Sequence, residues 1–166
     1  MDLLTQEELL ELGFESVGQN TMVSRDARFY SISGKIGDYT RIDAFAILTG
    51  HIELDTHVHI SPFSFLGGTG GKIHFMDNSG ISTHVSIFTK SDNYRNNSLE
   101  NKEQSKIIGD VTIGKNSIIG FSSVVMPGVT VSENVSIGAN SIIARNVNAG
   151  EIIISKGVGL ITLSVR

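Results

Sequence analysis

The sequence contains no cysteine and no tryptophan, and only two of its 166 residues are proline. Without cysteine the chain can form neither a disulfide bond nor a thiolate nucleophile. This composition fits the reducing cytoplasm, where we expect the protein to act. No apolar run approaches the roughly 18 residues that a membrane-spanning helix needs. Residues 1–8 are acidic and lack the basic region of a signal peptide. We therefore expect no membrane insertion.

Positive charge is also limited. The chain carries 13 Lys and Arg residues against 17 Asp and Glu, which gives a formal net charge of −4, and the basic residues form no cluster. Non-specific binding to nucleic acid is therefore not expected. Aromatic residues account for only 7% of the chain, whereas glycine occurs 18 times. This composition favours a turn-dense repeat protein over a helical bundle, and the length fits one domain.

Aliphatic residues recur at every sixth position over most of the chain. These first-position residues are Ile36, Ile42, Leu48, Leu54, Ile60, Leu66, Ile107, Ile113, Ile119, Val125, Val131, Ile137 and Ile143. Four positions after each of them stands a small or β-branched residue, for example Ala46, Val58 and Ser117. This hexad is typical of a parallel β-helix, in which three hexads, about 18 residues, make one coil. We therefore predict an all-β fold with ladders of aliphatic side chains in its interior.

Two regions are distinguished by this pattern. We expect residues 1–29 to form an N-terminal helix and a lead-in, and residues 30–166 to form the β-helix domain. Thr5 and Glu8 have the spacing of a capping box, which predicts the start of the short helix. The apolar side of this helix is predicted to consist of Leu9, Leu10 and Leu12.

The hexads are interrupted twice. They slip by three residues within the glycine-rich residues 67–71, where a bulged corner explains the glycines better than a phosphate-binding loop does. They break off in residues 92–106, a polar stretch that we expect to leave the solenoid as an extended loop. The aliphatic tail, residues 151–166, is expected to cover the open end of the solenoid or to pack on a partner.

The hexads carry a resemblance to a known family. Residues 113–129, with Gly114, Gly120 and the Pro127-Gly128 pair, resemble the closing coils of hexapeptide-repeat acyltransferases of the galactoside and maltose acetyltransferase type. Residues 41–50 are similar to acetyltransferases found in surface-polysaccharide clusters. The resemblance implies a left-handed β-helix, against the usual right-handed crossover. It also implies a homotrimer with active sites between subunits and acetyl-CoA as the co-substrate.

Asp92 stands at the position where this resemblance places a catalytic histidine. In the galactoside-type enzymes, that histidine ends the hexad before the loop and removes the proton of the acceptor hydroxyl. Here the hexad is residues 87–92, so the position holds an aspartate. A carboxylate is a weak base for an alcohol near neutral pH unless burial changes it. Asp92 is therefore a candidate either for the base or for a group that binds and orients the acceptor.

Two histidines are further candidates. His59 falls where the related enzymes place a polar acceptor-site side chain that faces the neighbouring subunit. Because imidazole titrates near neutral pH, we predict that His59 is the general base. The alternative is a surface histidine bonded to a neighbouring strand. His84 lies in the coil before the loop and should point outward. We predict that it shapes the acceptor site together with Asp92.

The donor site is predicted from the resemblance alone. Phe121 and Ala139 occupy corners that in the family lie beside the pantetheine arm of coenzyme A, so both are predicted to bind this co-substrate. The alternative is that they are ordinary corner residues. The family's tail motif, a glycine and a proline followed by basic residues, is not present in residues 157–161.

The histidines also offer an alternative, a metal site. His57 and His59 would point the same way if both lay on one strand, and solenoids that resemble γ-class carbonic anhydrases bind zinc with three histidines. The third ligand here would be His84 or His51. The expected spacing of such a site is not reproduced in the sequence, so we predict no metal.

Together these observations predict an acetyl-CoA-dependent O-acetyltransferase that acts on a sugar or a nucleotide-linked sugar in surface-polysaccharide biosynthesis. A second hypothesis is N-acetylation of an amino sugar, because a free amine needs less help from a base than a hydroxyl does. A third hypothesis is an inactive β-helix that serves as a scaffold subunit.

Overall fold

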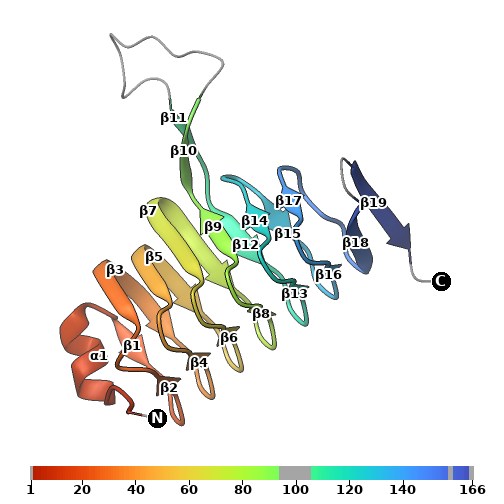
Figure 1. Ribbon diagram of the computed structural model, residues 1–166. Coiled ribbons are helices and arrows are strands. Elements are labelled where there is room, and N and C mark those ends of the chain that lie inside the picture. The colour runs from red at the N-terminus through yellow and green to blue at the C-terminus, as the bar shows by residue number, and fades with distance from the viewer. Residues whose placement is uncertain (1, 94–105, 157–158, 165–166) are drawn as a thin grey trace, which may run out of the picture.

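The computed structural model describes residues 2–93, 106–156 and 159–164, with side chains described up to Ser155. The chain winds into a left-handed parallel β-helix of about 7 turns, which confirms the predicted fold class. The coils stack in sequence order from the N-terminal helix to the C-terminal hairpin (Figure 1). In the part of the chain that the structure describes, no helix is long and apolar enough to cross a membrane.

The short helix α1 (Gln6–Leu12) covers the N-terminal end of the solenoid. Its predicted capping box is confirmed, because the Thr5 hydroxyl accepts the backbone N–H of Glu8 and the Glu8 carboxylate accepts that of Thr5. Only Leu9 is buried in the core, while Leu10 and Leu12 are exposed. The predicted three-leucine face was therefore wrong, since a helix of two turns rests on the first coil through a single narrow line of contact.

Three faces make up the solenoid. Face 1 consists of the first parts of β3 (Arg28–Ile36), β5 (Ile47–Leu54) and β7 (Phe65–Phe75), with β9 (Ser86–Phe88), β14 (Val124–Val125) and β17 (Ile142–Ile143). Face 2 consists of β1 (Ser16–Val17), the later parts of β3, β5 and β7, β12 (Val111–Ile113) and β15 (Thr130–Val131). Face 3 consists of β2 (Met22–Val23), β4 (Arg41–Ile42), β6 (His59–Ile60), β8 (Gly80–Ile81), β13 (Ile118–Ile119), β16 (Ser136–Ile137) and β18 (Glu151–Lys156). Since β1 and β2 already pair with β3 and β4, the first coil begins inside the expected lead-in.

The parallel register follows the predicted coil length. Arg41 pairs with His59, and Thr112 pairs with Thr130, each one coil along. The register between β5 and β7 shifts after Gly50, so that His51 pairs with Lys72. This shift confirms the three-residue slip. With the exception of Ile107, the aliphatic first-position residues face inward and form one continuous buried core along the solenoid.

The corners explain the compact residues at the fifth position of each hexad. Buried hydroxyls there satisfy corner carbonyl groups: Thr40 donates to the Asp55 carbonyl oxygen at 2.8 Å, and Ser117 donates to that of Ser132 at 2.8 Å. Many corners also contain a residue with positive φ, including the bulky Phe45 (φ 63°) and Phe63 (φ 57°). Such a conformation costs about 1–2 kcal/mol per residue that is not glycine. The packing of the rings described below offsets part of this cost.

Two hairpins leave the regular coils. The strands β10 (Lys90–Asp92) and β11 (Lys106–Ile108) pair in antiparallel fashion and project from the corner between faces 1 and 2 (Figure 1). They form the base of the predicted loop, whose residues 94–105 lie outside the described residues. Ile107 is exposed on this hairpin, so its assignment to the interior ladder was wrong; the coil resumes only at Val111. At the C-terminus, β18 continues face 3 and pairs in antiparallel fashion with β19 (Gly159–Ser164).

Candidate functional site

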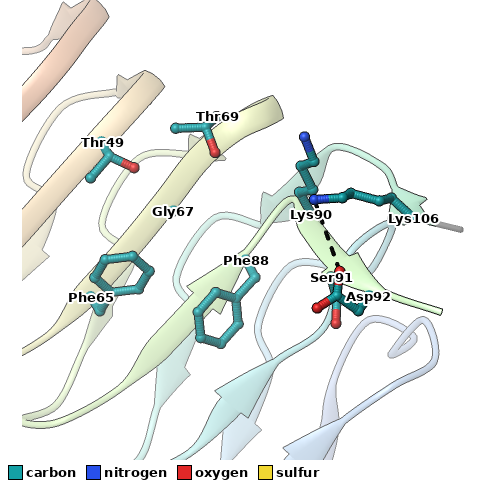
Figure 2. A pocket seen from close by; sticks show the side chains of 9 residues that line it. All are labelled: Thr49, Phe65, Gly67, Thr69, Phe88, Lys90, Ser91, Asp92 and Lys106. Atoms are coloured by element: carbon teal, nitrogen blue, oxygen red, sulfur yellow. Dashed lines mark ion pairs between the residues drawn. The ribbon is translucent and has the colours of Figure 1, made fainter. Parts of the chain in front are cut away.

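A pocket of about 330 Å³ lies where the β10–β11 hairpin leaves face 1 (Figure 2). The residues that line it are Thr49, Phe65, Gly67, Thr69, Phe88, Lys90, Ser91, Asp92 and Lys106. Face 1 supplies the aromatic and glycine floor, and the hairpin supplies the charged wall. Of these residues, only Asp92 is a site residue predicted from the sequence.

The charged wall combines two cations with one carboxylate. Lys106 Nζ lies 3.9 Å from Asp92 Oδ1, at the limit of an ion pair, and the Asp92 side chain is 90% exposed. Lys90 has no ion pair within the described ranges. A wall with an excess positive charge and a reachable carboxylate suits a ligand that carries both anionic oxygens and a cationic or hydrogen-donating group.

The floor of the pocket is apolar. The rings of Phe65 and Phe88 lie 5.4 Å apart at an interplanar angle of 44°. Gly67 lies opposite Phe88 in the parallel pairing of β7 with β9. A Cβ atom on Gly67 would come within 2.9 Å of the Phe65 ring, so glycine keeps the floor open. Aromatic rings beside lysines are a common surface for planar or sugar-like ligands.

A second polar cluster lies on face 3, at its corner with face 1. The Asp43 side chain is only 5% exposed, and both of its oxygens are occupied. Oδ1 accepts a hydrogen bond from Arg41 Nε at 2.6 Å, and Oδ2 lies 2.8 Å from His59 Nε2. His59 itself is 47% exposed. A buried carboxylate with two partners holds both of them in a defined orientation.

The other predicted site residues lie along the same corner. His84 stacks on Phe63 at 5.2 Å and 9°, and the edge of Phe121 lies 5.5 Å from His84. Phe45 extends the stack beyond Phe63 at 5.1 Å. Ala139 is exposed on the next coil, where the Asn140 N–H donates to the Phe121 carbonyl oxygen at 2.8 Å. We call Phe45, Phe63, His84 and Phe121 the aromatic corner.

The structure therefore groups four of the five predicted site residues and separates the fifth. His59, His84, Phe121 and Ala139 share face 3 and the aromatic corner. Asp92 instead belongs to β10, which projects with β11 from a different corner of the solenoid (Figure 1). Within one chain, the predicted base and Asp92 do not meet.

His57 and His59, the first two ligands of the alternative metal site, do not lie on one strand. His57 lies in a corner with φ 58° and stacks on Tyr39 at 4.8 Å, so it does not alternate with His59 along a strand. His51 is on face 2, where its ring bonds Ser33 and Glu53. Among the described residues, no group of three or more His, Cys, Asp or Glu side chains could hold a metal ion.

Sequence reasoning missed Arg41 and Asp43 on face 3, and Phe65, Phe88 and Lys90 in the pocket. A signal was available for Arg41, because it precedes His59 by one coil length and therefore pairs with it. The aromatic pair offered no such signal. The three-residue slip and the strand offset bring Phe65 beside Phe88 although they are not one coil length apart.

No model of a known protein family matches the sequence. The chain is 37% identical over 136 residues to a dTDP-4-amino-4,6-dideoxy-D-glucose acyltransferase from Escherichia coli, over 76% of this chain and 70% of the relative. The structure is similar to that of AntD, an N-acyltransferase from Bacillus cereus in complex with dTDP and 3-hydroxybutyryl-CoA. The TM-score is 0.87 at 32% identity, over 100% of this chain and 91% of that one. A maltose O-acetyltransferase from Clostridium difficile shares the fold, with a TM-score of 0.63 at 22% identity, over 96% and 75% of the two chains.

Proposed function

Because this chain belongs to the hexapeptide-repeat acyltransferases and is an acyl-transfer enzyme, we propose that it acylates the amino group of a nucleotide-linked amino sugar. Acyl-coenzyme A is the donor. This assignment takes the N-acyl alternative of the sequence analysis over the O-acetyl one. The similarity to acyltransferases of a dTDP-linked amino sugar favours the amine.

The observation that carries the proposal is Asp92 in the pocket wall. An alcohol acceptor needs a base of moderate strength to remove its proton, which a carboxylate supplies poorly. An amino sugar instead brings its own nucleophile and a positive charge when protonated. A carboxylate beside Lys106 can bind and orient that group, while Lys90 and Lys106 attract the phosphates of a nucleotide.

The reaction that fits this site is aminolysis of a thioester. The ammonium group held beside Asp92 first loses one proton to water. The lone pair of the neutral sugar nitrogen then attacks the thioester carbonyl carbon, and a C–N bond forms. The C–S bond then breaks, the coenzyme A sulfur leaves with the electron pair, and one proton passes from nitrogen to sulfur. The products are an amide and free coenzyme A thiol, so no oxidant or metal is required.

A comparison of two positions supports the role of Asp92. AntD has been studied as variants of one serine and of one aspartate further along its chain. Ser82 and Asp92 have the same order and the same separation in this chain. Ser82 follows β8 at the corner between faces 3 and 1 and is half-buried. We assign Ser82 to the acceptor site together with Asp92.

The donor is proposed to lie along the aromatic corner, beside Phe121 and Ala139. Both side chains are exposed on successive coils, as a groove parallel to the solenoid axis requires. Acetyl-CoA is the donor that the sequence predicts, and AntD was crystallised with 3-hydroxybutyryl-CoA. Acyl groups of both lengths should therefore be compared as donors.

We also propose a homotrimer whose sites lie between subunits. Phe45, Phe63 and Phe121 are each about half exposed, at 52%, 52% and 48%, and they lie on one ridge with His84. An exposed aromatic ridge of this kind favours burial against another protein surface. A neighbouring copy would bring its hairpin pocket toward face 3 and so reunite Asp92 with His59.

A cytoplasmic role in surface-polysaccharide biosynthesis fits this assembly and the absence of cysteine.

The decisive experiment measures acyl transfer by the purified chain. dTDP-4-amino-4,6-dideoxyglucose, the matching 4-hydroxy sugar nucleotide and the free amino sugar are each incubated with acetyl-CoA or 3-hydroxybutyryl-CoA. Release of coenzyme A thiol is followed together with the mass of the sugar product. We expect an amide product with the nucleotide-linked amine only. An ester product would restore the O-acetyltransferase hypothesis, and no transfer to any acceptor would favour the scaffold hypothesis.

A further inference from the structure

His59 is not an isolated surface histidine, because it belongs to a hydrogen-bonded cluster with Asp43 and Arg41. Asp43 is almost completely buried, and its two oxygens contact Arg41 Nε and His59 Nε2. From this geometry we propose that Asp43 is a positioning residue, which holds His59 with its Nδ1 atom toward the acceptor sugar. The inference rests on the proposed function, and it adds the group that positions the histidine.

The hydrogen bonds fix the tautomer of the imidazole. An ionised carboxylate only accepts hydrogen bonds, and an arginine guanidinium only donates them. Asp43 therefore accepts from both partners, and the proton of a neutral His59 ring resides on Nε2. Its Nδ1 then carries the lone pair. Nothing else among the described residues bonds to Nδ1, so this atom is available as an acceptor on the surface of face 3.

On the neighbouring coil, the residue that pairs with His59 is a glycine. Gly80 pairs with His59 on one side and with Ile118 on the other, so the outward column lacks a side chain between them. A Cβ atom on Gly80 would lie 2.9 Å from the His59 carbonyl oxygen and 3.4 Å from its Cβ atom. Ser82 lies two residues beyond Gly80 and is half-buried. Residue 80 therefore places no side chain of its own beside the His59 ring.

The hydrogen-bond donors and acceptors of the cluster indicate which ligand groups it can bind. The terminal nitrogens of Arg41 donate hydrogen bonds and carry positive charge, while Nδ1 of His59 accepts a hydrogen bond. A hydroxyl group that lies near a phosphate matches this pair, because the hydroxyl donates to the imidazole and the phosphate accepts from the guanidinium. The sugar of a nucleotide-linked substrate has this arrangement. His59 therefore binds a sugar hydroxyl, and Asp43 keeps it oriented to do so.

Face 2 offers a matched control. There His74 Nε2 lies 3.0 Å from Asp55 Oδ2, a similar pair with no assigned role in the site. Asp43→Asn and Asp55→Asn remove the same charge from the two pairs. We expect kcat/KM for the nucleotide-linked amino sugar to fall about 10- to 100-fold in Asp43→Asn and less than about 2-fold in Asp55→Asn. Because loss of a buried carboxylate could unfold the chain, His59→Phe is the second variant, and it should lose as much as Asp43→Asn.

A spectroscopic readout separates positioning from general stability. The chain has only 5 histidines, so ¹⁵N-labelled imidazole signals can be assigned by the His59→Phe difference. We expect the neutral His59 ring to be protonated at Nε2 in the wild type and to shift toward the Nδ1-protonated form in Asp43→Asn. Wild-type-like turnover in both Asp43→Asn and His59→Phe, or a wild-type ring protonated at Nδ1, would overturn the inference. Failure of the wild type to acylate any amino sugar would instead overturn the proposed function, and the ¹⁵N spectrum would still decide the orientation of His59.

Discussion

Gly67 lies opposite Phe88 in the parallel pairing of β7 with β9, and its missing side chain opens the floor of the hairpin pocket. A methyl group at Gly67 would approach the Phe65 ring to 2.9 Å and the Phe88 ring to 3.5 Å. The pocket exists because one position on the outer surface of face 1 has no side chain. This relationship gives a direct test of whether the pocket binds the substrate.

Substitution of Gly67 should impair binding more than folding. In Gly67→Ala the Phe65 ring has to move away from the new methyl group, and a displacement of about 1 Å in a site can cost up to about 100-fold in rate. We expect kcat/KM for the nucleotide-linked amino sugar to fall about 10-fold or more. Thermal unfolding should change little, because a ring at the end of a side chain can move. A variant with unchanged kinetics would place the substrate elsewhere.

The two lysines of the pocket should act on binding rather than on chemistry. Replacement of Lys90 or Lys106 by Gln removes a positive charge that attracts phosphate. We expect KM for the nucleotide sugar to rise about 10-fold with kcat nearly unchanged, and the effect to shrink as salt is added. Lys35→Gln, on face 2 beside Asp55, is the charge-matched control. A drop in kcat with constant KM would assign the lysines to the transition state instead.

The separation of Asp92 from His59 predicts complementation between subunits. Asp92→Asn and His59→Phe should each be impaired in a homotrimer. When the two chains are co-expressed in equal amounts, a given interface receives an intact Asp92 and an intact His59 in about one case in four, since each is contributed with a probability of about one half. We expect the co-expressed population as a whole to recover about a quarter of wild-type activity. If mixed trimers form but show no recovery, both residues serve the same subunit's site.

The stability of the solenoid should depend on the buried ladder and not on the outer columns. Ile60 is completely buried, and Ile60→Ala should reduce the free energy of unfolding by about 2–5 kcal/mol. Ile118→Ala is the control on the same face, because that side chain is 46% exposed, and its effect should stay within about 1 kcal/mol. Urea denaturation of the two variants measures this difference. Equal losses would mean that Ile118 is covered in the assembled protein.

The cap of α1 should make stability depend on pH at the acid end. Hydrogen bonds from Arg25 and from the Thr5 backbone lower the pKa of Glu8 from its usual value to about 2. The folded state therefore gains stability from this carboxylate above pH 4.5, and the gain is lost as the pH falls toward 2. Glu8→Gln should unfold at a lower temperature than the wild type at pH 7, and the difference should disappear near pH 2. Glu11→Gln, on the same helix, is the control.

The local rules of the coil could be predicted from the sequence. The hexads located the buried ladder, and the capping box located the start of α1. The glycine-rich stretch located the point where β5 and β7 change register. These features depend on neighbours along the chain or one coil away. The assignment of Ile107 to the ladder was wrong because the β10–β11 hairpin carries that residue out of the solenoid, although its position fits the six-residue period.

The candidate site could be predicted only in part. Asp92 and His59 were identified as single candidates, yet their partners were not. Asp43 reaches His59 because the corner after β4 turns its side chain back against the next coil. Lys106 lies opposite Asp92 because β10 and β11 pair as a hairpin. Neither relationship has a fixed spacing in sequence.

The sequence by itself thus determined the coil, its interior and its family, because each of these depends on a repeat that every coil must satisfy to bury its aliphatic side chains. The tertiary structure alone decided which polar side chains meet. The outward positions carry no such repeat, and a side chain there finds its partners through corners, a bulge and a hairpin. Their geometry is set by the stacking of many coils, and so the pocket of Phe65, Phe88 and Asp92 and the Asp43–His59 pair appear only in the folded molecule.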